Sequence, residues 1–196
     1  MTYPLAPHGK ITPSWLVLHW ATVPHLGNLQ DYDPRGYSRA IIMEKMEQLA
    51  ERESQGRWGG YNAFWLPTGP ELVTPPGQRA YHAGGSEGLK NPNSNGFGLG
   101  VPYISASTRS RDIAGEIEAP LYLMSSGTTV QGYYPPLDAA MLRECVEWAR
   151  EHFIAQGWTR HGVVTHAQIN AKKNDIRHEV LPPGASVAEL SAIFTA

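Results

Sequence analysis

The chain has 196 residues, of which 41% are hydrophobic and 17% charged, and its formal net charge is −2. A chain of this length forms one domain that buries roughly 70% of its unfolded surface. The small net charge and the lack of Lys/Arg blocks argue against nucleic-acid binding and against attachment to a membrane surface. No apolar run reaches the roughly 18 residues of a membrane span, and a single cysteine, Cys145, excludes a disulfide within the chain.

The N-terminal part of the sequence alternates strand-like and helix-like segments. Residues 14–20, SWLVLHW, form a short run of apolar, branched and aromatic residues, which is typical of a buried strand. Residues 36–53 place Ile42, Met46 and Leu49 on one helical face and predict a helix. The run GRWGGYNAFWLP predicts a second strand, and TGPELVTPP predicts a turn into a short third strand.

The C-terminal part contains the clearest helix. Residues 83–96 are turn-forming and predict a long surface loop, 97–105 predict a strand, and 106–134 give no clear pattern. Residues 135–157 predict a helix with proline at its start, a buried Cys145 and a final Gly157. GVVTH (162–166) predicts the last core strand, and a short helix is expected after PPGAS. The whole pattern favours an α/β single domain over residues 1–196, with a central mixed β-sheet flanked by helices.

Two histidines follow apolar strand-like runs: His19 comes after SWLVL and His166 after GVVT. Strand ends can present side chains to a cleft at the edge of a sheet. Together with Asp175, two imidazoles and one carboxylate form a ligand set for a catalytic zinc that leaves a fourth position to water. No local signature such as H-E-x-x-H joins the two, and a single histidine in such a position more often caps an element or fills the core than binds a metal.

Five segments connect this ligand set to a known family. WLVLHW, YNAFWL, AYHAGG, NSNGFGLGV and VVTHAQINAKKND occur in the order and rough spacing of the zinc-dependent N-acetylmuramoyl-L-alanine amidases. This is the type 2 amidase family, which includes phage lysins and the peptidoglycan recognition proteins, and the chain resembles it over roughly residues 14–176. The resemblance implies an amidase/peptidoglycan-recognition-protein-like fold. It also implies a Zn²⁺ hydrolase that cleaves the amide between N-acetylmuramic acid and the L-alanine of the stem peptide.

The same resemblance implies the metal ligands. His19, His166 and Asp175 match the zinc ligands of the family, and His178, three residues after the aspartate, is a competing ligand. The usual Asp-Pro-Gly is replaced by residues 175–177, Asp-Ile-Arg, so the rigid turn after the aspartate is missing.

Further residues are implied around the metal. Lys173 looks like the cation that stabilises the oxyanion, with Lys172 as the alternative. Tyr61 matches a tyrosine near the metal-bound water, although it could simply pack on the core. The implied substrate-binding residues are His82, Trp20 and Asn95. His82 could instead only cap the Gly-rich loop that follows it.

The general base is left open by the sequence. Some family members carry a glutamate as general base where Gly100 stands here. The base would then be Tyr61, another carboxylate such as Glu116 or Glu118, or zinc hydroxide acting with Lys173. Phage lysins of the family also lack this glutamate, so the change indicates a subtype.

Two other functions remain open: a non-catalytic peptidoglycan-binding module of the recognition-protein type, and a phage-tail or secretion-associated structural protein. The N-terminal MTYPLAPHGK lacks the features of a signal peptide. We therefore expect synthesis in the cytoplasm and action on peptidoglycan in the periplasm or cell wall. A phage or prophage endolysin released by a holin, or an antibacterial effector injected by a secretion apparatus, fits this expectation.

Overall fold

The computed structural model describes residues 9–22, 61–66, 69–83, 87–103, 106–123 and 125–196. The helix predicted over 36–53 lies outside the described residues. Among those that are described, no helix is both long enough and apolar enough to cross a bilayer.

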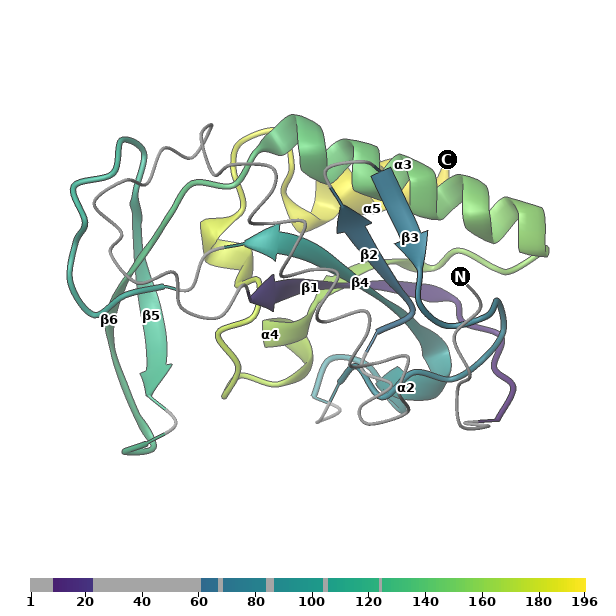
Figure 1. The fold of residues 1–196 in the computed structure, drawn as a ribbon, viewed down its shortest axis with the longest axis horizontal. Helices are drawn as coiled ribbons and strands as arrows, with labels where there is room; N and C mark the ends of the chain where they lie inside the picture. Colours follow the sequence, from purple (N-terminus) through teal and green to yellow (C-terminus); the bar gives the residue numbers. More distant parts are fainter. Residues whose placement is uncertain (1–8, 23–60, 67–68, 84–86, 104–105, 124) are drawn as a thin grey trace.

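The centre of the fold is a five-stranded sheet with strand order β3-β2-β4-β1-β7 (Figure 1). Its neighbouring strands run parallel except for the antiparallel pair β2–β3. The sequence-based prediction of an α/β fold with a mixed sheet is therefore confirmed. The strands are β1 (Trp15–Thr22), β2 (Ala63–Leu66), β3 (Gly69–Leu72), β4 (Gly96–Tyr103) and β7 (Gly162–Thr165).

Helix α3 (Ala139–Gln156) lies across one face of the sheet beside α5 (Val187–Thr195) (Figure 1). The helix begins a few residues after the predicted start at 135, because the Asp138 carboxylate caps it by accepting hydrogen bonds from two first-turn amides. It ends at Gly157, whose φ of 67° is in the left-handed region. The predicted burial of Cys145 on its inner face is confirmed.

The segment 106–134, which had no clear pattern in the sequence, contains a hairpin of β5 (Ile117–Leu123) and β6 (Thr128–Tyr134). The hairpin stands beside the main sheet rather than within it (Figure 1). Pro120 and Gly132 lie inside its strands, where both residue types are normally disfavoured. A Cβ on Gly132 would collide with Leu121, so the glycine is needed for packing.

The predicted long surface loop at 83–96 is partly wrong. Its Leu89 is buried, and its end forms a single helical turn, α2 (Pro92–Asn95). The side chain of Asn93 accepts from the backbone nitrogen of Ala83 and donates to its carbonyl, both at 2.8 Å. This pairing fixes the segment that directly follows His82.

The two faces of the sheet have different cores. Leu16 and Leu18 of β1 pack with the buried face of α3, and each such leucine contributes roughly 2 kcal/mol through burial. Because alternate strand side chains point to opposite faces, Val17 and His19 lie on the other face. There Val17 packs with Ile169 of α4 (His166–Ile169), a second helical turn. The alternation of β1 therefore places His19 on the face that carries α4.

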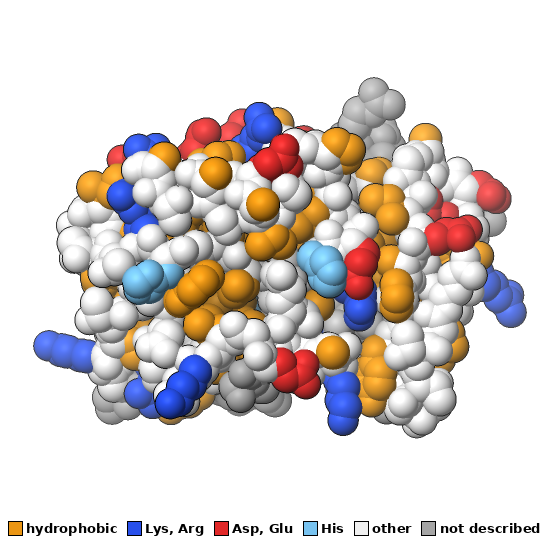
Figure 2. Space-filling view, turned by 180° about the vertical axis from the view of Figure 1, so that it is seen from behind, with side chains coloured by type: hydrophobic (Ala, Val, Ile, Leu, Met, Phe, Trp, Pro, Cys, Tyr) orange, Lys and Arg blue, Asp and Glu red, His pale blue; other side chains and the backbone are white. Residues whose placement is uncertain are grey.

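The surface has no concentrated charge on the side shown in Figure 2. Acidic and basic side chains are interspersed there with apolar ones, in agreement with the small net charge.

Candidate metal centre

His19 is held inside the sheet. It pairs in register with Gly100 of the parallel strand β4, and its side chain is fully buried. It lies three residues before the end of β1, so the expectation that it closes the strand is only approximately met. Its position next to Gly100 means that no side chain of the neighbouring strand covers the ring from that pair position.

His166 begins α4 directly after β7. The Thr165 amide donates to the Gln168 side chain at 2.9 Å, which holds the turn where strand changes to helix. Leu18 is the register partner of Thr165, so His19 and His166 occupy the next positions along neighbouring strands. Their ring centroids are 4.5 Å apart.

Asp175 completes the cluster from the loop after α4. Its Oδ2 atom lies 3.3 Å from Nδ1 of His19 and also contacts Nδ1 of His166. One ligand atom from each of these three residues lies within 4.8 Å of the others. In the part of the chain that the structure describes, this is the group of acidic, histidine or cysteine side chains that could hold a metal ion. The structure thus brings together the three residues predicted as ligands, from positions up to 156 residues apart.

The loop that carries Asp175 is tethered to the hairpin by Asn174. The Asn174 side chain accepts from the backbone nitrogen of Tyr122 and donates to its carbonyl, both at 2.7 Å. It thereby pairs with β5 as a short piece of strand would. Sequence reasoning missed this residue, because an asparagine in a polar loop carries no signal of its partner.

The protonation states of the cluster suit a cation. Burial lowers the pKa of His19 to about 4, so the imidazole is neutral and keeps a lone pair at neutral pH. Burial alone would raise the pKa of Asp175, but the hydrogen bond with His166 brings it below its usual range. The carboxylate is therefore charged.

The donor set fits a zinc-like ion. Neutral imidazole nitrogens and a carboxylate oxygen are ordinary ligands of Zn²⁺, and three protein ligands are typical of catalytic sites. Among the described residues, Nε2 of His166 is buried without a hydrogen-bond partner, on the side of the ring opposite the nitrogen that meets Asp175.

Tyr61 and Lys173 lie beside the cluster. The Tyr61 ring contacts His19 edge-on, with centroids 5.2 Å apart, and it also packs against Phe64. Lys173 is half-buried, and its positive charge contributes to the lowered pKa of His19. Lys172 is exposed, which favours Lys173 among the two lysines.

Asn62 fixes the strand start next to Tyr61 and was not singled out from the sequence. It is buried, accepts from the Gly98 amide at 2.8 Å, and donates to the Thr74 hydroxyl and the Gln78 carbonyl, both at 3.1 Å. The signal was present in YNAFWL, since a polar residue within an apolar strand needs buried partners.

The residues predicted to bind substrate are placed differently from one another. His82 is buried behind His19, with its Nδ1 atom 3.0 Å from Nε2 of His19. Asn95 donates to the Lys90 carbonyl at 2.7 Å and is the last residue of α2, directly before β4 and roughly 16 Å along the strand direction from Gly100. Trp20 follows His19 in β1, and its side chain is outside the described part. The substrate roles of these three residues stay predictions.

The alternative ligand and the alternative bases lie outside the cluster. The His178 imidazole is exposed and pairs with Glu179 at 3.3 Å. The Glu116 carboxylate accepts from Ser110, and Glu118 pairs with Gln131 across the hairpin.

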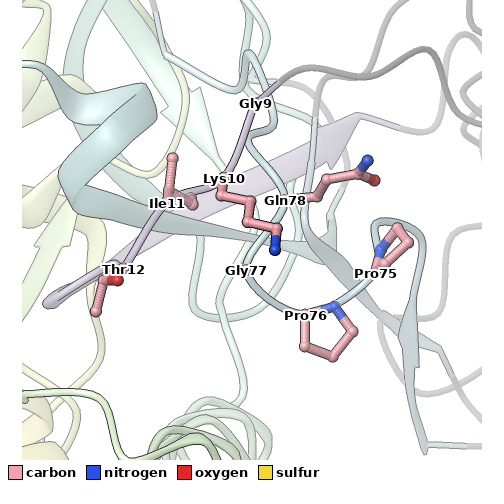
Figure 3. Close-up of a pocket in the computed structure, with 8 residues that line it drawn as sticks. All are labelled: Gly9, Lys10, Ile11, Thr12, Pro75, Pro76, Gly77 and Gln78. Atoms are coloured by element: carbon pink, nitrogen blue, oxygen red, sulfur yellow. The ribbon is translucent and has the colours of Figure 1, made fainter.

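A hollow of about 640 Å³ lies elsewhere, between residues 9–12 and 75–78 (Figure 3). Lys10, Pro75 and Pro76 line it (Figure 3). It is next to the segment that leads into β1, whereas His19 lies in the second half of that strand. None of the predicted site residues lines this hollow.

Comparisons of the chain with protein-family models, with curated proteins and with solved structures find no match. The resemblance to the amidases therefore rests on the ordered sequence segments, and the candidate metal centre rests on the geometry of His19, His166 and Asp175.

Proposed function

We propose that the protein is a zinc-dependent peptidoglycan amidase that hydrolyses the amide between N-acetylmuramic acid and the L-alanine of the stem peptide. The observation that carries the proposal is the convergence of His19, His166 and Asp175 on one point from three separate segments. The order of the five amidase-like segments supports the choice of substrate class. A phage or prophage endolysin or an injected antibacterial effector is the setting that we favour.

His19, His166 and Asp175 would hold the zinc ion. When bound at such a site, zinc polarises a carbonyl oxygen and lowers the pKa of water to about 7. The Lys173 ammonium, on the loop between His166 and Asp175, would stabilise negative charge that develops on the carbonyl oxygen of the cleaved amide. Removal of such a donor typically slows a reaction by about 10²–10³-fold.

Proton transfer would fall to Tyr61 and Lys173. Gly100 offers no carboxylate, and the side chains of Glu116 and Glu118 have partners at the hairpin. The Tyr61 ring is beside His19, which makes its hydroxyl the nearest described candidate for orienting water and passing its proton towards the leaving amine.

The test is digestion of purified sacculi with and without a chelator, followed by mass spectrometry of the released fragments. We expect about one zinc per chain, release of stem peptides with a free L-alanine amine, and loss of release in the chelator. His166→Ala should abolish both zinc binding and release. His161→Ala is the matched control, because His161 is exposed and packs on Trp15 away from the cluster.

Three results would count against the proposal. Full activity of a metal-free preparation would contradict the role of zinc. Binding of muramyl peptide without cleavage would favour a recognition module. Stable assembly without either property would favour a structural protein.

A further inference from the structure

His82 is packed into a depression that the glycines of β4 create. Its side chain is 6% exposed. A Cβ built on Gly98 would lie 2.7 Å from the His82 Cβ and 2.9 Å from its Cδ2, and one on Gly96 would lie 3.3 Å from its Cε1. Any larger residue at 98 would displace the ring. Gly96 and Gly98, the alternating glycines at the start of NGFGLG, therefore leave the space in which the His82 ring packs against the strand backbone.

The ring is also held in a defined orientation. Nε2 of His82 lies 3.2 Å from the Gly96 carbonyl oxygen, and Nδ1 faces Nε2 of His19 at 3.0 Å. Asn93 fixes the adjoining residue Ala83 through its backbone nitrogen and carbonyl. Both ring nitrogens of His82 are thus committed to partners within the protein.

The chemistry of these partners determines where the protons are. A carbonyl oxygen only accepts, so Nε2 of His82 carries the hydrogen and its Nδ1 is an acceptor in the neutral ring. Nε2 of His19 must then donate to that acceptor, which leaves Nδ1 of His19 as a bare lone pair.

This order of protons has a consequence for the cluster. The lone pair on Nδ1 of His19 faces the Asp175 carboxylate oxygen at 3.3 Å. Two acceptors at this separation repel each other unless a cation lies near both. Nδ1 of His19 therefore carries no hydrogen and keeps the lone pair that a metal ion requires of its ligand.

We propose that His82, anchored on the Gly96 carbonyl, is a positioning residue that holds His19 as its Nε2–H tautomer and so selects Nδ1 as the metal-binding atom. The selection of a metal-binding atom rests on the proposed function. The proton positions themselves are inferred from the hydrogen-bond partners of the neutral rings.

The first measurement is a long-range ¹H–¹⁵N spectrum of the full chain labelled at histidine, at pH 7.5, without metal and with added zinc. We expect the Nε2–H tautomer for His19 and His82 in both samples, and a metal-induced shift at Nδ1 of His19. A hydrogen on Nδ1 of His19 in the metal-free protein would overturn the inference. If the wild-type chain binds no zinc, the proposed function fails, whereas the tautomer in the metal-free sample still decides this inference.

The second measurement compares two variants by zinc titration. His82→Phe keeps the volume of the ring but offers no acceptor, and we expect zinc affinity to fall about 10–100-fold and the His19 tautomer to become mixed. His82→Gln offers an amide N–H to Gly96 and an amide oxygen to His19, and it should restore the tautomer and most of the affinity.

His152→Phe is the matched control, because His152 stacks on Trp148 in an aromatic cluster outside the site. It should leave zinc affinity unchanged. Wild-type affinity in His82→Phe would overturn the inference, as would equal losses in the Phe and Gln variants. If His82→Phe does not fold, the wild-type spectrum and the Gln variant still decide.

Discussion

The two halves of the candidate metal centre are built in different ways. His19 is held by the central sheet: it pairs with Gly100 of β4, and its second ring nitrogen meets the buried His82. Asp175 lies on a loop, and its neighbour Asn174 ties that loop to the separate hairpin. The side chain of His19 is fully buried, whereas that of Asp175 is 16% exposed.

The difference shows that the two ligands depend on different parts of the fold. The register of β1 and β4 determines the position of His19, so this ligand should be preorganised whenever the sheet is folded. The Pro-Gly turn of the amidases is absent, and the position of Asp175 depends on the two hydrogen bonds of its neighbour Asn174 and on the burial of its other neighbour, Ile176, in the core. A bound cation would join the two halves, and the stability of the loop should therefore respond to metal more than that of the sheet.

The largest effect is expected from Asp175→Asn, which removes the charged ligand of the loop half while keeping its shape. Zinc affinity should fall about 100-fold or more, because an amide oxygen carries no charge to offset the cation. Calorimetric titration with zinc measures the change. Glu147→Gln on the exposed face of α3 makes the same chemical change away from the site and should have no effect. Affinity within threefold of wild type for Asp175→Asn would show that the loop half is not part of a metal centre.

A smaller effect is expected from Asn174→Ala, which cuts the tether but leaves all three ligands. The loop would then order only when the metal binds, and we expect zinc affinity to fall about 10-fold, in the range of other residues that orient ligands. Hydrogen exchange of the Tyr122 amide should rise in the metal-free variant.

Asn93→Ala is the matched control on the sheet half, since Asn93 makes the same bidentate pairing with Ala83. It should weaken zinc binding less, because the glycine-lined depression still holds His82. Equal losses in the two asparagine variants would remove the distinction between the halves.

The smallest effect is expected from Tyr134→Phe, which changes the hairpin to which Asn174 ties the Asp175 loop. The quantity measured is the free energy of unfolding. The Tyr134 hydroxyl donates to the Pro120 carbonyl at 2.7 Å, and removing this bond should cost about 1 kcal/mol of the free energy of unfolding. Burial raises the pKa of Tyr134 to about 12, against the opposing charge of Arg177.

The alkaline dependence follows from this shift. Because the pKa is higher in the folded state, the stabilisation is complete below about pH 10 and is lost as the pH rises towards 12. Urea unfolding at pH 8 and across this range should show a steeper loss for wild type than for Tyr134→Phe. Tyr81→Phe, at an exposed tyrosine, is the control. Parallel curves for wild type and Tyr134→Phe would contradict the assigned burial effect.

Several elements could be predicted because their signals are local. The apolar run that became β1, the amphipathic pattern of α3 and the short helix α5 after PPGAS each reflect the environment of one segment. The hairpin could not be predicted, since Pro120 and Gly132 interrupt its strands and only cross-strand packing makes them acceptable. The turn α2 was missed for a similar reason, because its turn-forming residues pair with a segment about ten residues earlier.

The metal ligands were predicted from their residue types and from the order of the family-like segments, while the residues that support them were not. Asn62, Asn93 and Asn174 each pair with backbone groups of a distant or separate segment. Such partners leave no periodic trace in the sequence. His82 was expected to face substrate, and its described contacts are instead with His19 and Gly96.

By itself, the sequence determined which segments form strands and helices and which side chains are able to bind a metal. The reason is that periodicity and ligand chemistry are properties of single residues and their near neighbours. Only the tertiary structure decided that His19, His166 and Asp175 meet, that Asn174 anchors the loop, and that His82 lies against Nε2 of His19. These features depend on strand register and on hydrogen-bond partners that are remote along the chain.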